Sequence, residues 1–252
     1  MLVDTHCHFD EYSNPEEIVA AATAEGVGRI IAVGMHVVKF QAVLDLARNL
    51  PGIYPALGIH PEEVKDYPSL AGELPSHVKF IREAAPQLVA IAEIGLDHYF
   101  VKDHNLWPLE EIVFGEMLPI AEEFHLPVSV HVKDAEPRVL EILSSYAIPG
   151  VVIHWYSGPD SAYNEAIDRG YFFSVPRAVA YSPRVQMVAR DTPLDQLLLE
   201  SDGPASFRGI TGEPKDCAFV VGEIANMRGL DPAELEMQIE QNTRNVFPKV
   251  FQ

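Results

Sequence analysis

The sequence predicts an α/β fold, a single-domain TIM (β/α)₈ barrel that spans residues 1–252. Eight short runs rich in β-branched residues alternate with longer segments whose apolar residues recur at helical spacing. The short runs are continuously apolar, as expected of parallel strands that are buried on both faces. A chain of 252 residues also has the length of one such barrel, so we expect one domain.

The eight runs predict strands at Leu2–His6, Arg29–Val33, Ile53–Gly58, Leu88–Ile94, Pro127–His131, Val151–His154, Tyr171–Val175 and Leu197–Glu200. Helical spacing is clearest at Pro15–Glu25, His36–Asn49, Glu110–Phe124, Glu136–Tyr146 and Ser161–Arg169. Pro119 predicts a kink or a late start of the helix before His125. An open doubly wound sheet is the alternative, but no glycine-rich phosphate-binding sequence follows the first strand.

Two further segments, His60–Gly72 and Asp202–Asp216, are predicted to be the longest loops. Long loops on a barrel often contact the substrate. The two cysteines, Cys7 and Cys217, lie too far apart in the sequence to suggest a disulfide framework. Cys7 follows His6 directly on the predicted strand and therefore points to the other face, so both thiols are expected to be reduced and structural.

The formal net charge of −19 excludes a broad basic face that would hold duplex DNA. It does not exclude a nucleic-acid substrate, because a bound metal pair adds about +4 of local charge. No apolar run reaches the ~20 residues that span a bilayer. The chain opens without a basic and apolar leader, so we expect a cytoplasmic location, no membrane contact and no obligate protein partner.

The first predicted strand ends in the sequence DTHCH at residues 4–8. His6 and His8 are two residues apart on or just past a strand, so their imidazoles face the same way. Two nitrogen donors on one face favour a metal site. A lone histidine is more often a surface residue or a satisfied core residue, so the remaining strands decide the question.

Polar residues of ligand type also follow four other apolar strands: Glu93, His131, His154 and Asp202. Taken singly, Glu93 could pair with an arginine, a histidine could donate to a carbonyl group, and Asp202 could cap a turn. Taken together, they lie at the carboxyl ends of strands one, four, five, six and eight, where barrel enzymes build their active sites. A buried carboxylate in an apolar run such as residues 88–95 is costly without a charged partner, and a metal is such a partner.

Nitrogen and carboxylate donors together suit Zn²⁺, Mn²⁺, Fe²⁺ or Ni²⁺, and less readily Ca²⁺. Six ligands exceed the four of a structural zinc site, so a catalytic pair of divalent ions is expected.

These motifs resemble the TatD family of metal-dependent deoxyribonucleases, within the amidohydrolase superfamily. The resemblance covers nearly the whole chain and rests on motifs in the family's order: DTHCHFD at 4–10, GIHPE at 58–62, AEIGLDHYF at 92–100, LPVSVHVKDA at 126–135, VIHWYSG at 152–158, LLLESDGP at 197–204 and NTRNVF at 242–247.

The resemblance implies a barrel with two divalent ions, of which Mg²⁺ is a further candidate, and hydrolysis of phosphodiester bonds in DNA. It implies that His6, His8 and Asp202 hold one ion, that Glu93 bridges both, and that His131 and His154 hold the other. Its expected substrate is DNA or a small phosphodiester.

The chain departs from the family pattern at several positions that are not ligands. Lys133 replaces the usual arginine, Ser201 a threonine and Ala205 an aromatic residue, while Glu110 and Met117 stand where glutamines are usual. The ligand set is intact, so hydrolysis is expected. Positions that contact the substrate differ from the family pattern.

These assignments predict a mechanism. Divalent ions lower the pKa of a bound water to about 7. Asp202 would orient the water and take its proton, and Asp202 and Glu93 are therefore the predicted catalytic pair. His60 and Lys133 would contact the phosphate, although His60 could also be a loop histidine with no substrate role. Asp97 and His98 are expected to support the ligands from behind.

Three alternatives stay open from the sequence. The first is an amidohydrolase that acts on a small amide, lactone or ester, although many such enzymes carry a carboxylated lysine where this chain has Glu93. The second is a phosphoesterase similar to histidinol phosphatase, which also opens with an HxH motif but needs more metal ligands. The third is a metal-binding protein without catalytic activity.

Overall fold

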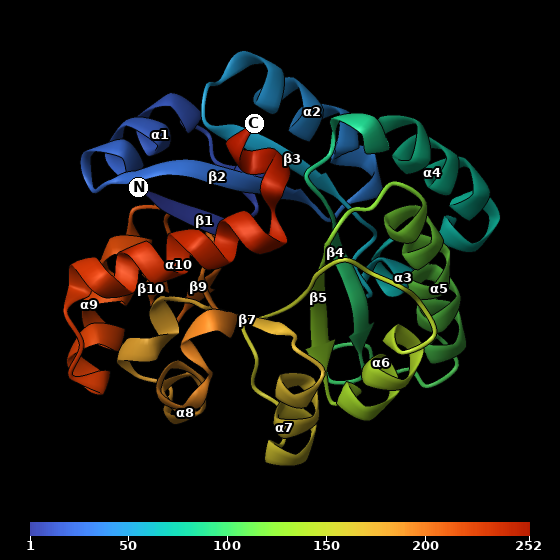
Figure 1. Ribbon diagram of the computed structural model, residues 1–252. Coiled ribbons are helices and arrows are strands. Elements are labelled where there is room, and N and C mark those ends of the chain that lie inside the picture. The colour runs from blue at the N-terminus through green and yellow to red at the C-terminus, as the bar shows by residue number, and fades with distance from the viewer.

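A computed structural model describes residues 1–252, with the side chain of Phe207 outside the description. The eight predicted strands form one parallel sheet in sequential order, which confirms the barrel (Figure 1). The strands are β1 Leu2–Cys7, β2 Val27–Gly34, β3 Ile53–Leu57, β4 Ala90–Asp97, β5 Val128–Lys133, β6 Val151–His154, β7 Phe172–Val175 and β8 Leu197–Leu199.

Helices follow the strands and form the outer layer of the barrel in Figure 1. They are α1 Pro15–Ala24, α2 Phe40–Asn49, α3 Glu63–Asp66, α4 Leu70–Ala84, α5 Trp107–Glu123, α6 Glu136–Leu143, α7 Asp160–Asp168, α8 Pro183–Asp191, α9 Asp216–Arg228 and α10 Pro232–Val246. Helix α5 starts before Glu110 and continues through Pro119, so the predicted late start is wrong. Pro108 near its amino end takes the place in the first turn that a proline tolerates.

Hydrogen bonds outside the strand ladder join the first strand to the segment around the last. The Thr5 hydroxyl donates to the Leu199 carbonyl oxygen at 2.7 Å. The backbone N–H of Asp202 donates to the carbonyl oxygen of His6 at 2.9 Å, and that of His8 donates to Gly203 at 2.8 Å. These bonds bring the carboxyl ends of β1 and β8 together, and with them the residues that follow each strand.

The interior of the barrel holds a compact apolar cluster. Its strand residues alternate along each strand, as Val152 of β6 and Leu198 of β8 illustrate, because every second side chain points inward. Phe247 and Val250, which follow α10, belong to the same cluster. The chain's last segment therefore fills one end of the barrel, and the polar residues gather at the other.

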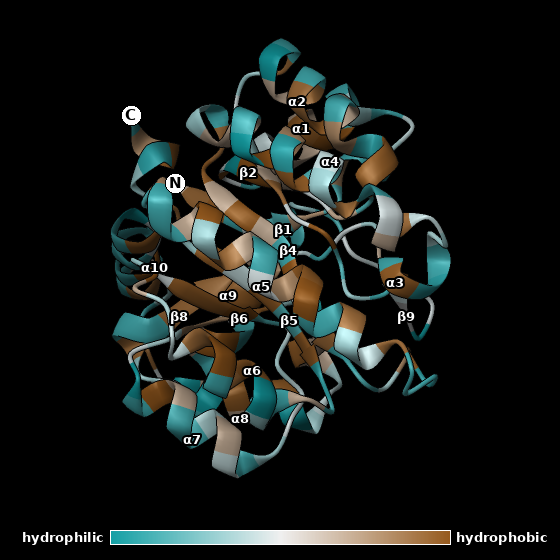
Figure 2. Cartoon of the chain, turned by 90° about the vertical axis from the view of Figure 1, so that its right-hand side faces the viewer, coloured by the Kyte–Doolittle hydropathy of each residue, from teal (hydrophilic) through white to brown (hydrophobic). Residues whose placement is uncertain are grey.

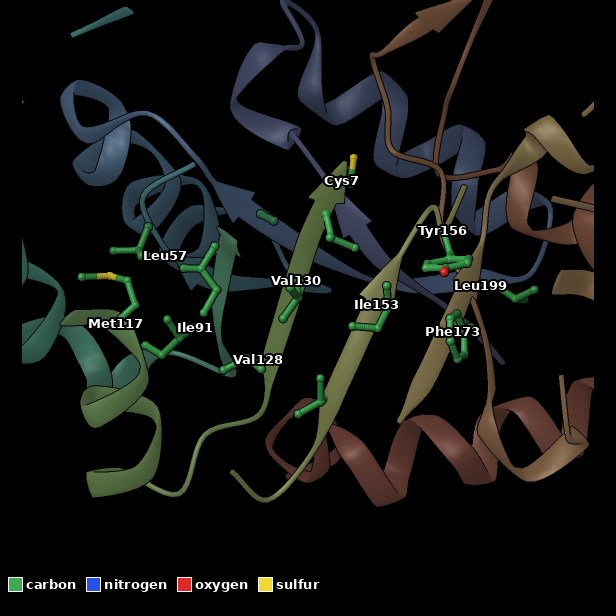
Figure 3. Close-up of a cluster of buried hydrophobic side chains, with 14 of the residues drawn as sticks. Cys7, Leu57, Ile91, Met117, Val128, Val130, Ile153, Tyr156, Phe173 and Leu199 are labelled. Atoms are coloured by element: carbon green, nitrogen blue, oxygen red, sulfur yellow. The ribbon is translucent and has the colours of Figure 1, made fainter. Parts of the chain in front are cut away.

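The larger apolar layer lies between the strands and the surrounding helices. Figure 3 shows part of it, with Val128 and Val130 of β5 beside Ile153 of β6. Hydrophobic residues dominate the strands in Figure 2, while the helices alternate hydrophobic with hydrophilic positions. The residues between the outward ones, such as Ser129 on β5, must then face the barrel interior.

The two segments predicted as long loops are more ordered than expected. Residues 60–72 contain the short helix α3 and the first turn of α4. Residues 202–216 contain a small antiparallel hairpin of β9 Ser206–Phe207 and β10 Ile210–Thr211. Two-residue strands give too short a pattern for sequence periodicity to reveal. Within the described part of the chain, no helix is both long and apolar enough to cross a membrane.

Candidate metal centre

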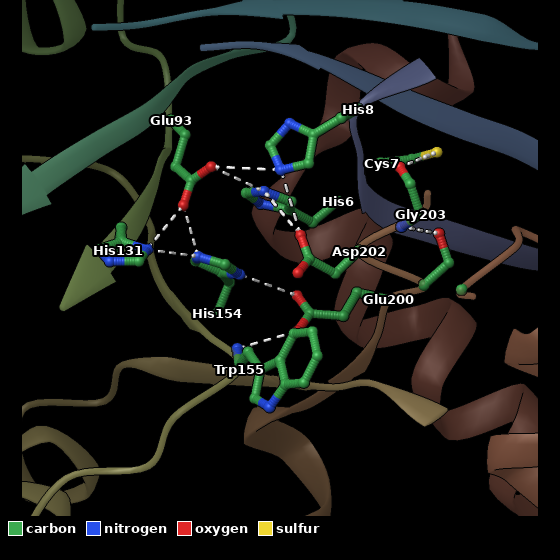
Figure 4. Close-up of polar contacts among 12 residues, drawn as sticks. His6, Cys7, His8, Glu93, His131, His154, Trp155, Glu200, Asp202 and Gly203 are labelled. Atoms are coloured by element: carbon green, nitrogen blue, oxygen red, sulfur yellow. Dashed lines mark hydrogen bonds and ion pairs between the residues drawn. The ribbon is translucent and has the colours of Figure 1, made fainter. Parts of the chain in front are cut away.

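The six residues predicted as ligands converge at the carboxyl ends of the strands (Figure 4). Their donor atoms form overlapping groups in which all members lie within 4.8 Å of one another: His6, His8 and Glu93, then His6, His154 and Asp202. A third group joins Glu93 and His131 to His60. All of these side chains are buried. Five separate strands or their ends therefore supply one cluster of nitrogen and oxygen donors.

Glu93 lies at the centre of the cluster, and its two oxygens face different histidines (Figure 4). Oε2 is 3.2 Å from His6 Nε2 and 3.6 Å from His8 Nε2. Oε1 is 2.6 Å from His154 Nε2 and 3.0 Å from His131 Nδ1. The two oxygens of one carboxylate thus face two sets of imidazoles, although the rings of His6 and His154, one from each set, also stack with centroids 4.0 Å apart.

Asp202 completes the first set, on the side of His6 and His8. Its Oδ1 lies 3.2 Å from His8 Nε2 and 3.7 Å from His6 Nε2. Asp202 has a φ of +50°, a left-handed conformation that is uncommon outside glycine. Such a conformation persists where the surrounding structure holds the residue, and here the bond from the Asp202 N–H to β1 does so.

His60 lies closer to the cluster than the sequence indicated. Its Nε2 is 3.5 Å from Glu93 Oε1, and its ring meets that of His131 edge to face. Its Nδ1 accepts the backbone N–H of Glu62, which leaves Nε2 directed toward Glu93. The GIHPE segment therefore adds a seventh donor to the cluster, on the side of His131.

The backbone around Glu93 explains how a buried strand presents a carboxylate. Glu93 lies in the interior of β4, not at its end as predicted, because the strand continues to Asp97. The ladder with β5 shifts register between Ile91 and Ile94. Beyond the shift, a Cβ on Gly95 would lie 1.9 Å from the His131 carbonyl oxygen, so only glycine allows β4 and β5 to approach this closely.

Two polar residues hydrogen-bond the histidines from behind, and a third, Glu200, lies near His154 without a hydrogen bond to it. His6 Nδ1 lies 3.0 Å from Ser129 Oγ, and His131 Nε2 lies 2.7 Å from Asp97 Oδ2. His154 Nδ1 is 3.7 Å from Glu200 Oε2. Such partners fix the orientation of a ligating imidazole. The expected supporting role of Asp97 agrees with this geometry.

Sequence reasoning missed the roles of Glu200 and Ser129. Glu200 accepts the backbone N–H of Trp155 and the hydroxyl of Ser174, and it is fully buried. Strand alternation could have shown that these residues face the barrel interior, because Ser129 lies two residues before His131 on the same strand. Leu198 and Glu200 follow the same spacing.

His98 does not support the ligands as expected. Its ring stacks on Trp107 at 3.7 Å, and its Nε2 lies 3.6 Å from Glu110 Oε2. The residue follows the end of β4 and turns away from His131 toward α5. One residue past a strand, the direction of a side chain depends on the turn, which the sequence pattern does not determine.

The carboxylate of Asp4 on β1 hydrogen-bonds the segment that follows β8. It accepts hydrogen bonds from the Ser201 N–H, the Ser201 hydroxyl and the His6 N–H. Burial nevertheless raises the pKa of Asp4 to about 7. Cys7 is buried and its Sγ lies 3.4 Å from the Gly203 carbonyl oxygen, so it packs in this seam, as expected of a structural thiol.

Electrostatics keep Glu93 ionised. Burial raises the pKa of Glu93, but the surrounding histidines, with His154 foremost, outweigh it and hold the pKa well below its usual range. Burial lowers the pKa of His6 and of His60, which favours the neutral imidazole that binds metal. Burial also lowers the pKa of His8, His131 and His154, but the neighbouring carboxylates outweigh it and raise the pKa of these three imidazoles, so they would release a proton on ligating a cation.

Lys133 ends β5 at the rim of the cluster. Its ammonium group donates to Ser157 Oγ at 2.8 Å. Burial lowers the pKa of Lys133, although the carboxylates of Asp97 and Asp202 oppose that shift. The Lys133 ammonium group therefore lies at the carboxyl ends of β5 and β6.

The residues fit a divalent cation. Among the described side chains, Asp202 Oδ1 is buried without a hydrogen-bond partner. It shares one small space with imidazole nitrogens and the Glu93 carboxylate. Its contact with His8 Nε2 at 3.2 Å lacks hydrogen-bond geometry, so a cation bound there would satisfy a buried oxygen that accepts no hydrogen bond. Imidazole donors outnumber carboxylates here, which suits a divalent transition metal such as Zn²⁺, Fe²⁺ or Ni²⁺.

The parallel barrel with a polar cluster at the carboxyl ends of its strands places the chain among (β/α)₈ enzymes. Its sequence matches the family model "TatD related DNase" over residues 3–248, and the chain belongs to this family of hydrolases.

Relatives match along nearly the full length of the chain. The human "Deoxyribonuclease TATDN3" is 28% identical, with 99% of this chain and 95% of the relative covered. The "3'-5' ssDNA/RNA exonuclease TatD" of Citrobacter rodentium is 29% identical, with 92% and 91% covered. The solved structure of the TatD homologue YjjV from Escherichia coli superposes with a TM-score of 0.88 at 27% identity, covering 98% of both chains.

Proposed function

We propose that this protein is a phosphodiesterase that uses two divalent ions to hydrolyse DNA or a related phosphodiester. The observation that best supports this proposal is the position of Glu93. Its Oε2 faces His6 and His8, and its Oε1 faces His131 and His154. His6, His8 and Asp202 would hold one ion. His131 and His154 would hold the other, with Glu93 between them.

His60 has two possible roles in this proposal. Its Nε2 faces the same Glu93 oxygen as His131 and His154, so it would complete the second ion's ligands or donate to the phosphate. Bound ions would supply Lewis acidity, which makes water a competent nucleophile at neutral pH. Asp202 would orient that water and accept its proton through a carboxylate oxygen.

Other residues would prepare the site for reaction. Asp97 holds His131 from behind by a hydrogen bond, so this imidazole would keep its orientation as the substrate binds, and the Glu200 carboxylate would attract a protonated His154. Lys133 would neutralise a substrate phosphate as a point charge, without the paired hydrogen bonds of an arginine. The cluster is buried and would exclude bulk water, which strengthens each of these interactions.

Nucleic acid is the favoured substrate because relatives of similar length are named for deoxyribonuclease and exonuclease activity. The net charge of −19 restricts how it would bind. Broad contact with duplex phosphates is disfavoured, so binding would rely on the ions and on local contacts at the rim. The proposal also states that the protein binds two ions and is cytoplasmic. It further states that the protein needs no obligate protein partner and consists of a single domain.

The direct test is incubation of the purified protein with Mg²⁺, Mn²⁺ or Zn²⁺ and end-labelled single-stranded or duplex DNA, resolved by length. We expect ion-dependent cleavage that EDTA abolishes. Parallel assays with amide, lactone and carboxyl ester substrates test the amidohydrolase alternative. Hydrolysis of those substrates without cleavage of any phosphodiester would overturn the proposal.

A further inference from the structure

The turn that follows β4 exposes two aromatic rings beside the candidate metal centre. Tyr99 is 54% exposed and Phe100 is 50% exposed, whereas most large hydrophobic side chains of the described chain are buried. Their rings meet edge to face, with centroids 4.8 Å apart. This arrangement leaves ring surface available to a further aromatic group.

One carboxylate ties this pair to the metal centre. Asp97 Oδ1 accepts the backbone N–H groups of Tyr99 at 2.9 Å and Phe100 at 2.6 Å. Its other oxygen, Oδ2, lies 2.7 Å from His131 Nε2. The side chain that orients a candidate ligand therefore also sets the position of the aromatic pair relative to it.

The rest of the turn is ordered by its own contacts. Val101 is buried, its N–H donates to the Asp97 carbonyl oxygen, and its own carbonyl oxygen accepts the indole N–H of Trp107. Trp107 packs in turn against His98 and His104 at 3.7 and 4.0 Å. The backbone that carries the two exposed rings is thus ordered before any ligand binds, which reduces the entropy lost on binding.

The surroundings restrict what can occupy this platform. Residues 102–105 are exposed and polar, so the apolar surface is limited to about two rings. That is far less than the ~800 Å² per partner of a stable protein interface. The backbone N–H of His98 donates to the Lys133 carbonyl oxygen, so the turn lies against the end of β5, and Lys133 there carries an ammonium group that donates to Ser157. A planar, apolar group joined to a phosphate fits both features.

We propose that Tyr99 and Phe100 form a stacking platform for an unpaired nucleobase next to the scissile phosphate. The platform would favour single-stranded over duplex substrates, because a paired base has no free face to stack. This inference rests on the proposed function and adds to it the residues that select the substrate. It requires no contact with a particular base, so sequence preference would be weak.

The test measures equilibrium binding of a short single-stranded oligonucleotide to the Mg²⁺-loaded protein. The oligonucleotide carries phosphorothioate linkages that slow cleavage and the fluorescent base 2-aminopurine, whose emission falls on stacking. The double variant Tyr99→Ala/Phe100→Ala should raise Kd about tenfold or more and reduce the quenching. Tyr99→Phe keeps the ring and should retain both, and Met237→Ala on α10, 66% exposed, is the matched control.

A second series of oligonucleotides separates stacking from other contacts. In this series, each oligonucleotide has a propyl spacer in place of a different nucleoside. When the spacer replaces the nucleoside that stacks on the platform, the wild type and the double variant should bind with equal Kd. An unchanged Kd in the double variant, or a loss that persists with every spacer oligonucleotide, would overturn the platform.

The same experiment distinguishes the platform from the enzyme. A wild-type protein that cleaves unmodified oligonucleotides, with a KM that the double variant does not change, contradicts the platform alone. A wild type that neither binds nor cleaves single strands contradicts both proposals.

Discussion

At the scale of single residues, the account depends most on Glu93. We expect Glu93→Ala to lower turnover at least about 10³-fold, since bound ions supply several kcal/mol of transition-state stabilisation. The barrel should still fold, because the change removes a ligand and not core packing. Steady-state kinetics with circular dichroism checks both points, and Glu93→Gln repeats the test with a side chain of the same shape. Full activity in either variant contradicts the bridging role.

Lys133 is expected to act on binding more than on chemistry. Lys133→Ala should raise KM about tenfold with a smaller effect on kcat, if the ammonium group contacts a phosphate oxygen of the bound substrate. Lys79→Ala is the matched control, because Lys79 is an exposed lysine on the outer helix α4. An unchanged KM, or a loss confined to kcat, would remove Lys133 from the substrate-binding site.

The sequence was sufficient to predict that the six candidate ligands would lie together, and the reason is physical. Glu93, His131, His154 and Asp202 interrupt or follow apolar runs, where an unpaired polar side chain would be costly, and His6 and His8 share one face of the first strand. His60 could be placed only as a contact to the phosphate, because it lies in a loop whose path depends on tertiary packing. Strand alternation puts Glu200 and His154 on the inward side of their strands, but it does not show that the two side chains lie 3.7 Å apart across the barrel.

At the scale of elements, helix α5 buries a carboxyl group beside β4. Glu110 is fully buried and accepts the Asp97 N–H through Oε1, while its Oε2 has no hydrogen-bond partner among the described residues. Burial raises the pKa of Glu110 to about 8, from an ordinary value of 4.5. The folded protein therefore binds this proton more tightly than the unfolded chain does.

This difference predicts a pH-dependent effect of Glu110→Gln. Between about pH 4.5 and pH 8 the folded state holds the extra proton, so the contribution of Glu110 to stability falls as pH rises through this window. Glutamine keeps an acceptor for Asp97 and has no charge to lose. The stability gained by Glu110→Gln should thus be at least about 1 kcal/mol larger at pH 8.5 than at pH 5.

Chemical denaturation at the two pH values measures this difference. Glu116→Gln, an exposed position on the same helix, is the control and should show no comparable change. A gain from Glu110→Gln that is the same at both pH values would show that the buried carboxyl does not titrate in this range.

The elements themselves were predicted to within a few residues at most ends. The largest error at a strand end concerns β4, whose predicted end at Ile94 falls three residues before Asp97, and among the predicted helices α2 begins at Phe40, four residues after His36. The register shift with β5 and the glycine at position 95 allow the strand to continue past the carboxylate. The hairpin of β9 and β10 went unpredicted, because it is held by its partner strand and not by local preference.

At the scale of the whole molecule, the candidate ligands join β1, β4, β5, β6 and the segment after β8. A cation held by all of these segments binds the folded barrel and not the unfolded chain, so it must stabilise the fold. At an ion concentration of about 100 times Kd the gain is ~2.7 kcal/mol. For a chain of this size, that is a rise in Tm of roughly 5–11 °C.

Thermal unfolding with and without saturating Mn²⁺ or Zn²⁺ measures this effect. Glu93→Ala should show a much smaller rise, because it lacks the central carboxylate. A Tm that does not respond to any divalent ion would contradict binding across the strands. An equal rise in wild type and variant would place the ion elsewhere.

The most direct measurement is anomalous diffraction from crystals of the protein grown with Mn²⁺. The account predicts two anomalous peaks, one on each side of the Glu93 carboxylate. One should lie beside His6, His8 and Asp202, and the other beside His131 and His154. Peaks confined to other parts of the surface, or a cluster that stays free of Mn²⁺ at saturating concentration, would contradict it.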